Sequence, residues 1–236
     1  MIKVKICGLT DARATAAAVE AGADYLGFMF YDRSPRFVTP ARAAELTQGL
    51  TAGVLKVGVF VDADDAAIGA ILQQAPLDML QLHGGESPQR IAQIRACFAL
   101  PVIKAVAIGG ETDIARAIAF QEAADMLLFD AKPPSTPGAL PGGNGLAFDW
   151  TLIRSVNWER PWMLSGGLNA GNLEDAARIS GARVVDVSSG VESAPGVKDS
   201  GKIREFIARA KRLPAASDLR QTDPPGRDAL QTHEDH

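Results

Sequence analysis

Short apolar segments alternate with longer amphipathic segments along the chain up to about residue 212. The short segments are rich in Val, Ile, Leu and Phe and are apolar on both faces, which is typical of parallel strands covered by helices. The longer segments are rich in alanine and apolar on one side, as helices packed on a sheet are. We expect strands at about 2–7, 24–29, 54–61, 77–82, 101–106, 125–130, 161–165 and 184–188. Helices are expected at about 11–21, 40–50, 63–74, 87–97, 111–122, 149–156, 170–180 and 199–211.

Eight strand–helix units of roughly 25 residues predict a closed (β/α)₈ barrel, the TIM barrel, in a single domain. A doubly wound open sheet usually has fewer strands, and a glycine-rich turn normally follows its first strand, which the segment KICGLT does not supply. The helix starts support this division of the chain. Thr10 or Asp11 is a suitable N-cap for the first helix, and Thr39 and Ser87 are each followed by a proline at the first helical position.

Composition and charge exclude several classes of protein. The chain has 236 residues, 47% of them apolar, a net charge of -4 and a pI near 5.4, which argues against nucleic-acid binding. It contains no apolar run near 18 residues and no secretory leader, so we expect neither a membrane span nor export. The two cysteines match no metal or disulfide spacing, which favours a reducing cytoplasm.

The C-terminal residues differ from the rest of the chain. From residue 213 onward five acidic residues face two arginines, so this segment carries -3 of the net charge of -4. It also contains three prolines and no aromatic residue. We therefore expect a catalytic domain at 1–212 and an acidic, disordered tail at 213–236.

The carboxyl ends of the strands form the active face of such barrels, so side chains there are candidates for chemistry. Cys7 ends the first strand and Asp130 ends the sixth. Asp130 follows the apolar run MLLF, which should raise its pKa and let it hold a proton, whereas nearby positive charge or amide dipoles should favour the Cys7 thiolate. The alternatives are that Cys7 is a small buried apolar residue and that Asp130 caps the following loop.

Two glycine-containing segments predict a phosphate site. Gly166-Gly167 follows the seventh strand and Ser188-Ser189-Gly190 follows the eighth. Their backbone N–H groups are little obstructed by side chains, and the loops after strands seven and eight often bind phosphate in these barrels, aided by a helix N-terminus. The alternative is that the glycines only permit tight turns.

Other strand ends supply further candidates. Arg36 follows Ser-Pro in a rigid turn and could hold a planar carboxylate with two hydrogen bonds; otherwise it is a solvated surface arginine. Gln81 and His83 end the fourth strand, and His83 is the only histidine before the tail. Lys5 should face the same way as Cys7 and needs an acidic neighbour, for which Asp186 is the candidate.

Two features remain open at this point. Lys104 in the fifth strand could form a Schiff base, or it faces inward or toward the mouth and pairs with a carboxylate. Residues 131–147 contain four prolines and four glycines and are too long for an ordinary loop of this kind. We expect a mobile lid over the active face rather than a linker.

Together, the motifs KICGLT, SPR, QLHGGES, LLFDA, FDW, LSGGL and DVSSGVE resemble those of phosphoribosylanthranilate isomerases, from residue 3 to about 206. The resemblance implies an Amadori rearrangement of N-(5-phosphoribosyl)anthranilate in tryptophan biosynthesis. It also implies that Cys7 is the general base, that Asp130 is the general acid, and that Arg36 lies near the anthranilate. The predicted substrate-binding residues are Arg36, Gln81, His83, Gly166, Gly167, Asp186, Ser188, Ser189 and Gly190.

This reaction needs no metal and no cofactor, and we expect none. The expected partner is the small phosphoribosyl substrate, and the protein is expected to be a monomer or homodimer in the cytoplasm. Two alternatives remain. One is a different phosphosugar barrel enzyme, either a histidine-pathway isomerase or an aldolase that uses Lys104. The other is a non-catalytic sensor of a phosphate-containing ligand.

Overall fold

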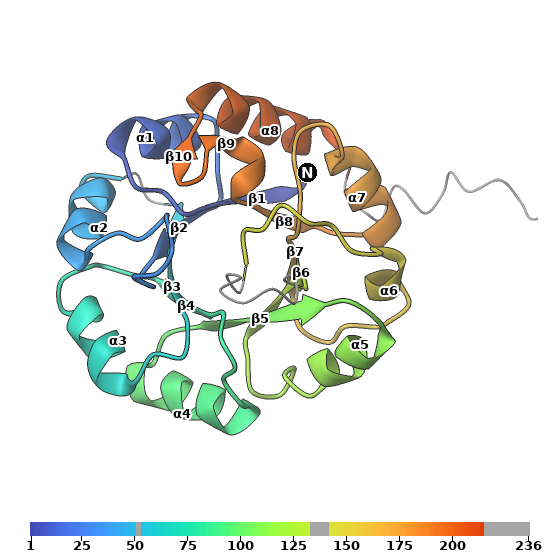
Figure 1. Ribbon diagram of the computed structural model, residues 1–236, viewed down its shortest axis with the longest axis horizontal. Coiled ribbons are helices and arrows are strands. Elements are labelled where there is room, and N and C mark those ends of the chain that lie inside the picture. Colours follow the sequence, from blue (N-terminus) through green and yellow to red (C-terminus); the bar gives the residue numbers. More distant parts are fainter. Residues whose placement is uncertain (51–52, 133–141, 215–236) are drawn as a thin grey trace, which may run out of the picture.

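The computed structural model describes residues 1–50, 53–132 and 142–214. Eight parallel strands form a closed barrel in chain order, and the helices form a ring around it (Figure 1). The strands are β1 (Lys3–Cys7), β2 (Tyr25–Met29), β3 (Leu55–Phe60), β4 (Met79–Leu82), β5 (Val102–Ile108), β6 (Met126–Ala131), β7 (Trp162–Leu164) and β8 (Val184–Val187). The helices are α1 (Ala12–Glu20), α2 (Pro40–Thr47), α3 (Asp65–Leu72), α4 (Pro88–Phe98), α5 (Glu111–Ile118), α6 (Thr151–Arg154), α7 (Leu173–Ser180) and α8 (Ser200–Arg212).

The predicted (β/α)₈ barrel is therefore confirmed. Each strand begins and ends within two residues of its expected bounds. The helix starts are confirmed at three N-caps, because the side chains of Asp11, Thr39 and Ser87 each accept a hydrogen bond from the backbone N–H three residues later. Several helices are shorter than expected; α5, for example, ends at Ile118.

An aspartate lies directly before each of the strands β2, β4 and β6. Each of these aspartates fixes the start of the previous strand in the chain, which is β1, β3 or β5. Its carboxylate accepts a hydrogen bond from a backbone N–H near the beginning of that neighbouring strand. These bonds run from Val4 to Asp24, from Lys56 to Asp78 and from Val102 to Asp125, at 2.8, 2.7 and 2.9 Å. The repeat holds the strands at matching heights at the N-terminal end of the barrel and leaves the other end for the site.

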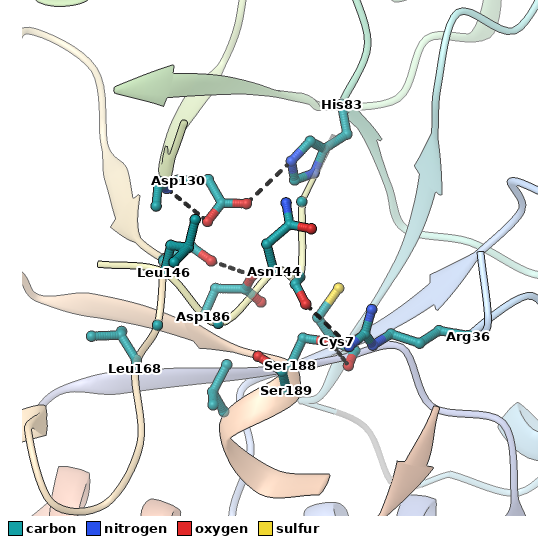
Figure 2. Close-up of a pocket in the computed structure, with 18 of the residues that line it drawn as sticks. Cys7, Arg36, His83, Asp130, Asn144, Leu146, Leu168, Asp186, Ser188 and Ser189 are labelled. Carbon is teal, nitrogen blue, oxygen red and sulfur yellow. Dashed lines mark hydrogen bonds and ion pairs between the residues drawn. The ribbon is translucent and has the colours of Figure 1, made fainter. Parts of the chain in front are cut away.

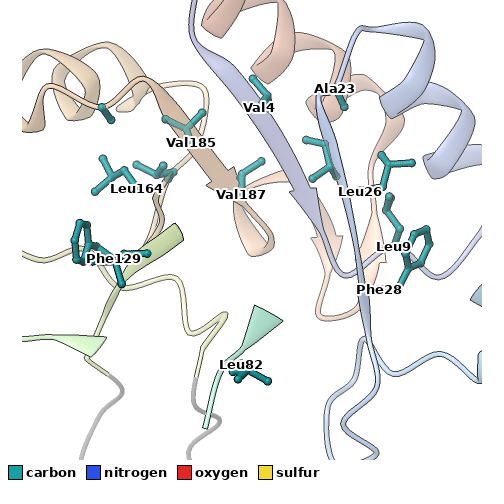
Figure 3. Packing of buried hydrophobic residues seen from close by; sticks show 14 of the residues in the cluster. Val4, Leu9, Ala23, Leu26, Phe28, Leu82, Phe129, Leu164, Val185 and Val187 are labelled. Carbon is teal, nitrogen blue, oxygen red and sulfur yellow. The ribbon is translucent and has the colours of Figure 1, made fainter. Parts of the chain in front are cut away.

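Apolar side chains pack in two layers, one inside the barrel and one between the strands and the helices. Successive side chains of a strand point to opposite faces. In β6, Leu128 lies in the cluster inside the barrel, whereas Phe129 packs outward against Trp158 with ring centroids 4.6 Å apart. Figure 3 shows part of the outer layer, including Phe129 and Leu26. Asp130 shares the inward face with Leu128, and this alternation directs the candidate acid into the barrel.

One element was not predicted. After β8 the chain forms a short 3₁₀ turn (Ser189–Val191) and then a two-stranded hairpin of β9 (Glu192–Ala194) and β10 (Val197–Lys198). The hairpin forms its own small sheet and contributes no strand to the barrel.

The end of α8 at Arg212 coincides with the predicted end of the domain. Beyond Pro214, the predicted tail at 213–236 lies outside the described residues. Within the described ranges, no helix is both long and apolar enough to cross a membrane.

Phe206 anchors the last helix, and its replacement tests the outer layer. Its side chain is completely buried in the apolar cluster between α8 and the barrel. We expect Phe206→Ala to lower the free energy of unfolding by about 3–5 kcal/mol, measured by urea denaturation. Glu205→Ala on the exposed face of the same helix is the matched control and should change it by less than about 0.5 kcal/mol. Equal effects of the two variants would contradict this packing.

Candidate active site

A cavity opens at the carboxyl ends of the strands, where the sequence predicted the active face (Figure 2). Its free volume is about 50 Å³, which leaves room for only a few water molecules. Nine of the predicted site residues line it: Cys7, Arg36, His83, Asp130, Gly166, Gly167, Asp186, Ser188 and Ser189. Gln81 and Gly190 lie next to lining residues but are not part of the wall.

Cys7 lies at the end of β1, with Lys5 below it on the same inward face. The Lys5 ammonium is completely buried and forms an ion pair with Asp186 of β8 at 2.8 Å, as the sequence predicted. Asp186 also accepts a hydrogen bond from the Ser165 hydroxyl at 3.2 Å. Lys5 of β1, Asp186 of β8 and Ser165, which directly follows β7, therefore form one connected polar group next to the cavity.

Burial raises the pKa of the Cys7 thiol, and this effect is larger than any other. The Lys5 charge next to the thiol opposes the shift, whereas the Asp186 carboxylate adds to it. The positive charge of Lys5 therefore favours the thiolate, as expected, but burial outweighs it and the net shift of the Cys7 pKa is upward. The sequence correctly placed a cation beside Cys7 but gave no measure of how strongly burial opposes the charged form.

Asp130 ends β6 and faces His83 across a short gap. The Nε2 atom of His83 lies 3.4 Å from Oδ2 of Asp130, and the backbone N–H of Ala131 donates to Oδ1 at 2.9 Å. Figure 2 shows Asp130 and Cys7 on different sides of the cavity. The carboxyl group and the thiol can therefore act on different atoms of one bound molecule.

Gln81 contacts His83 from below. Its side-chain amide lies 3.0 Å from Nδ1 of His83, and Gln81 itself is fully buried. When this amide donates to Nδ1, the neutral imidazole carries its proton on Nε2, which faces Asp130. Gln81 thus contacts His83 and does not line the cavity itself.

Arg36 is buried at the side of the cavity and is paired with a carboxylate that the sequence did not identify. Its Nε and Nη2 atoms donate to the two carboxylate oxygens of Glu192 at 2.7 and 3.0 Å. Nη2 also donates to the carbonyl oxygen of Gly143 at 3.3 Å. Arg36 therefore holds a carboxylate with two hydrogen bonds, as predicted, but this carboxylate belongs to Glu192 of the protein itself. The alternative of a solvated surface arginine is excluded.

The two predicted phosphate loops lie side by side at the cavity wall. Gly166 and Gly167 both have positive φ angles, 88° and 62°, which favour glycine. Gly190 packs so closely against the carbonyl oxygen of Leu168 that a side chain would not fit there. The Ser188 hydroxyl donates to the carbonyl oxygen of Cys7 at 3.1 Å. The glycines of this region are therefore required by the backbone conformation and by the close packing of the loops.

Residues 142–147, the described end of the predicted lid, cross the cavity. A Cβ atom on Gly142 would come within 2.7 Å of both Asp130 Oδ2 and His83 Nε2. At the other end, Gly167 lies against the backbone of Leu146. The segment thus covers the site residues and fills much of the space between them. The rest of the predicted lid, 133–141, lies outside the described residues.

Lys104 does not lie in the cavity. It is buried on the outward face of β5, where its ammonium group forms an ion pair with Glu86 at 2.6 Å and donates to the carbonyl oxygen of Gly84 at 2.7 Å. It also lies 5.6 Å from the centre of the Phe120 ring. The predicted pairing with a carboxylate is confirmed, but the inward orientation is wrong. A lysine held in this way is unsuited to forming a Schiff base with a ligand in the cavity.

Comparison with known proteins agrees with this site. The family model described as N-(5'phosphoribosyl)anthranilate (PRA) isomerase matches residues 4–209. An N-(5'-phosphoribosyl)anthranilate isomerase of Rhodospirillum centenum is 54% identical over 212 residues, covering 90% of this chain and 99% of that protein. The crystal structure of a phosphoribosyl anthranilate isomerase from Thermotoga maritima has a TM-score of 0.81 and 38% identity, covering 90% of this chain and 100% of that one.

A second solved structure contains a ligand. It is a phosphoribosyl anthranilate isomerase in complex with reduced 1-(o-carboxyphenylamino)-1-deoxyribulose 5-phosphate, with a TM-score of 0.78 and 37% identity over 90% of this chain and 100% of that chain. The family match, the relative and both structures extend over nearly the whole barrel. This chain belongs to the N-(5'-phosphoribosyl)anthranilate isomerase family.

Proposed function

We propose that the cavity carries out the Amadori rearrangement of N-(5-phosphoribosyl)anthranilate to 1-(2-carboxyphenylamino)-1-deoxyribulose 5-phosphate, with Cys7 as general base and Asp130 as general acid. The family is named for this isomerisation, which is a step of tryptophan biosynthesis. The observation that carries the residue assignment is the placement of one thiol and one carboxyl group on different sides of a single cavity, each at the end of a barrel strand.

The reaction needs a proton delivered at one atom and another removed at a second atom. Asp130 donates a proton to the furanose ring oxygen as the bond from that oxygen to C1 breaks and the nitrogen lone pair forms a C=N bond. The resulting Schiff base acidifies the proton on C2, which the Cys7 thiolate removes to give an enolamine. Protonation of C1 and loss of the proton from the C2 hydroxyl then give the ketone. The contact between His83 and Asp130 keeps the acid oriented toward the ring.

Two anionic groups of the substrate fix its direction in the cavity. The anthranilate carboxylate is assigned to the Arg36 side and the phosphate to the glycine and serine loops, at Gly166-Gly167 and Ser188-Ser189. A ligand that contains both groups is bound by a relative of similar fold, which supports this assignment. Residues 142 and 143 lie against Asp130, His83 and Arg36, so this segment has to move when such a ligand binds.

Replacement of the base and the acid tests the mechanism. Cys7→Ser keeps the shape but replaces a thiol with a group that ionises poorly, so kcat should fall by about 10²–10⁴-fold or more. Asp130→Asn should lower kcat by a similar factor because it cannot donate the proton. The double variant should lose less than the product of the two factors if the groups act as one unit.

The control is binding of the reduced product analogue, measured by calorimetry. Its affinity should change little in Cys7→Ser, because the carboxylate and phosphate contacts remain. Turnover near the wild-type rate in Cys7→Ser would remove Cys7 as the base, and His83 would be the next residue to test.

The raised pKa of Cys7 leads to a second prediction. Since burial disfavours the thiolate, the thiol of the free protein should titrate above its ordinary value of 9.0. The absorbance of the thiolate at 240 nm can be followed against pH in a Cys97→Ala protein, with Cys7→Ser/Cys97→Ala as the blank. kcat/KM should accordingly rise with pH through the neutral range, because the active fraction grows as the thiol ionises. A thiol titration midpoint near neutral pH would contradict the conclusion that burial has the largest effect on the pKa of Cys7.

The phosphate assignment is tested by adding a negative charge beside it. Ser189→Asp should raise KM at least about tenfold, because like charges repel at this distance in a partly buried site. Ser193→Asp adds the same charge on the exposed face of the neighbouring hairpin and should leave KM nearly unchanged. An unchanged KM in Ser189→Asp would place the phosphate elsewhere.

A further inference from the structure

We infer that Glu192 and Lys198, both in the β9–β10 hairpin, are positioning residues that hold Arg36 ready for the carboxylate of the substrate. The inference rests on the proposed function, because it concerns the side of the cavity assigned to that carboxylate. Neither residue lines the cavity. Glu192 acts directly on Arg36, and Lys198 acts on Arg36 through Glu192.

Glu192 fixes one edge of the Arg36 guanidinium. Nε and Nη2 donate to the two carboxylate oxygens at 2.7 and 3.0 Å, a pairing that sets both the position and the plane of the group. The other edge turns toward the segment that crosses the cavity, because a Cβ on Gly143 would lie 2.6 Å from Nη1. Glu192 therefore leaves the Nη1 side of Arg36 directed at the place where a ligand carboxylate would bind.

Lys198 in turn fixes Glu192. Its completely buried ammonium group donates to Glu192 Oε1 at 2.7 Å, to the carbonyl oxygen of Ser188 at 2.9 Å and to the Ser188 hydroxyl at 3.1 Å. An ammonium group has three hydrogens, so these contacts use its full donor capacity. The hairpin is thereby tied both to Arg36 and to the loop after β8.

The charges of this cluster favour an incoming anion. Arg36 and Lys198 are positive and Glu192 is negative, so the three side chains carry one net positive charge, almost completely shielded from solvent. The nearby Lys5–Asp186 pair is neutral and does not offset it. A substrate carboxylate at Arg36 would balance the charge of the cluster in a region where water contributes little screening.

The position of the hairpin in the fold supports a role in the site. β9 and β10 add nothing to the closed barrel, yet their two charged residues are buried and contact Arg36 and Ser188, which line the cavity. The neighbouring Ser193 on the same strand is exposed. Such a hairpin serves to place Glu192 and Lys198 more than to complete the core.

The experiment compares two ligands that differ by one carboxylate: the reduced product analogue and its counterpart with aniline in place of anthranilate. The ratio of their Kd values, measured by calorimetry, reports the preference for the carboxylate. Arg36→Met should remove most of this preference. Glu192→Gln adds positive charge to the cluster, but an amide cannot accept from both Arg36 donors, so the guanidinium loses its fixed plane. The ratio should therefore fall about tenfold, the effect of one lost charge-assisted hydrogen bond. Ser193→Ala, the control on the same strand, should leave the ratio unchanged.

Lys198→Gln is the second variant, for use if Glu192→Gln does not fold. It leaves Glu192 unanchored and removes the net charge of the cluster, so the ratio should also fall. Equal weakening of both ligands, or an unchanged or increased ratio, would overturn the inference and leave the hairpin with a structural role only. Wild-type turnover of N-(5-phosphoribosyl)anthranilate separates this result from a failure of the proposed function. If the wild-type protein turns over this substrate, the ratio of the two Kd values tests only the positioning role of Glu192.

Discussion

The ion pair between Lys5 and Asp186 is the interaction on which the site depends. The two residues are register partners on β1 and β8, the strands that close the barrel, and their side chains meet at 2.8 Å with almost no exposure to solvent. Removal of either partner would leave a charge buried without a counter-ion, which typically costs about 3–5 kcal/mol. The closing seam of the barrel and the environment of Cys7 are therefore set by the same pair. The Lys5 charge that stabilises the seam also limits how far burial raises the pKa of the thiol.

Buried ion pairs at Glu86 and at Glu192 lie at the same end of the barrel, and they hold the connections near the site. Glu86 accepts from Lys104, from the backbone N–H of Asp62 and from that of Gly84, which lies next to His83. The ion pair of Arg36 and Glu192 likewise holds the turn after β2 to the hairpin after β8. Such pairs gain little net free energy over apolar packing, but a displaced partner is strongly penalised. They therefore restrict the loops to one arrangement.

The barrel itself could be predicted because its signals are local. Apolar runs, N-caps such as Thr39 and Ser87 and the rule that parallel strands end on one face placed Cys7 and Asp130 at the cavity. The partner of Arg36 could not be predicted, since Glu192 is 156 residues away. The Pro195-Gly196 turn signals a bend there but does not show which residue the hairpin brings to Arg36. The direction of Lys104 was missed because inward and outward faces of a strand buried on both sides look alike in sequence. The pKa of Cys7 depends on a balance between burial and charge that a sequence does not measure.

Residues 142–147 include several glycines because their backbone passes close to side chains of the site. It passes between the His83–Asp130 contact and Arg36, where a Cβ on Gly142 or Gly143 would collide with these side chains. In this segment, the neutral carbonyl oxygen of Gly143 accepts a hydrogen bond from Nη2 of Arg36 at 3.3 Å. A carboxylate offers Arg36 a shorter, charge-assisted bond at the same edge, worth roughly twice a neutral one. In the proposed function, substrate therefore displaces the segment without breaking the Glu192 pairing, and Arg36 exchanges its hydrogen bond to Gly143 for one to the ligand.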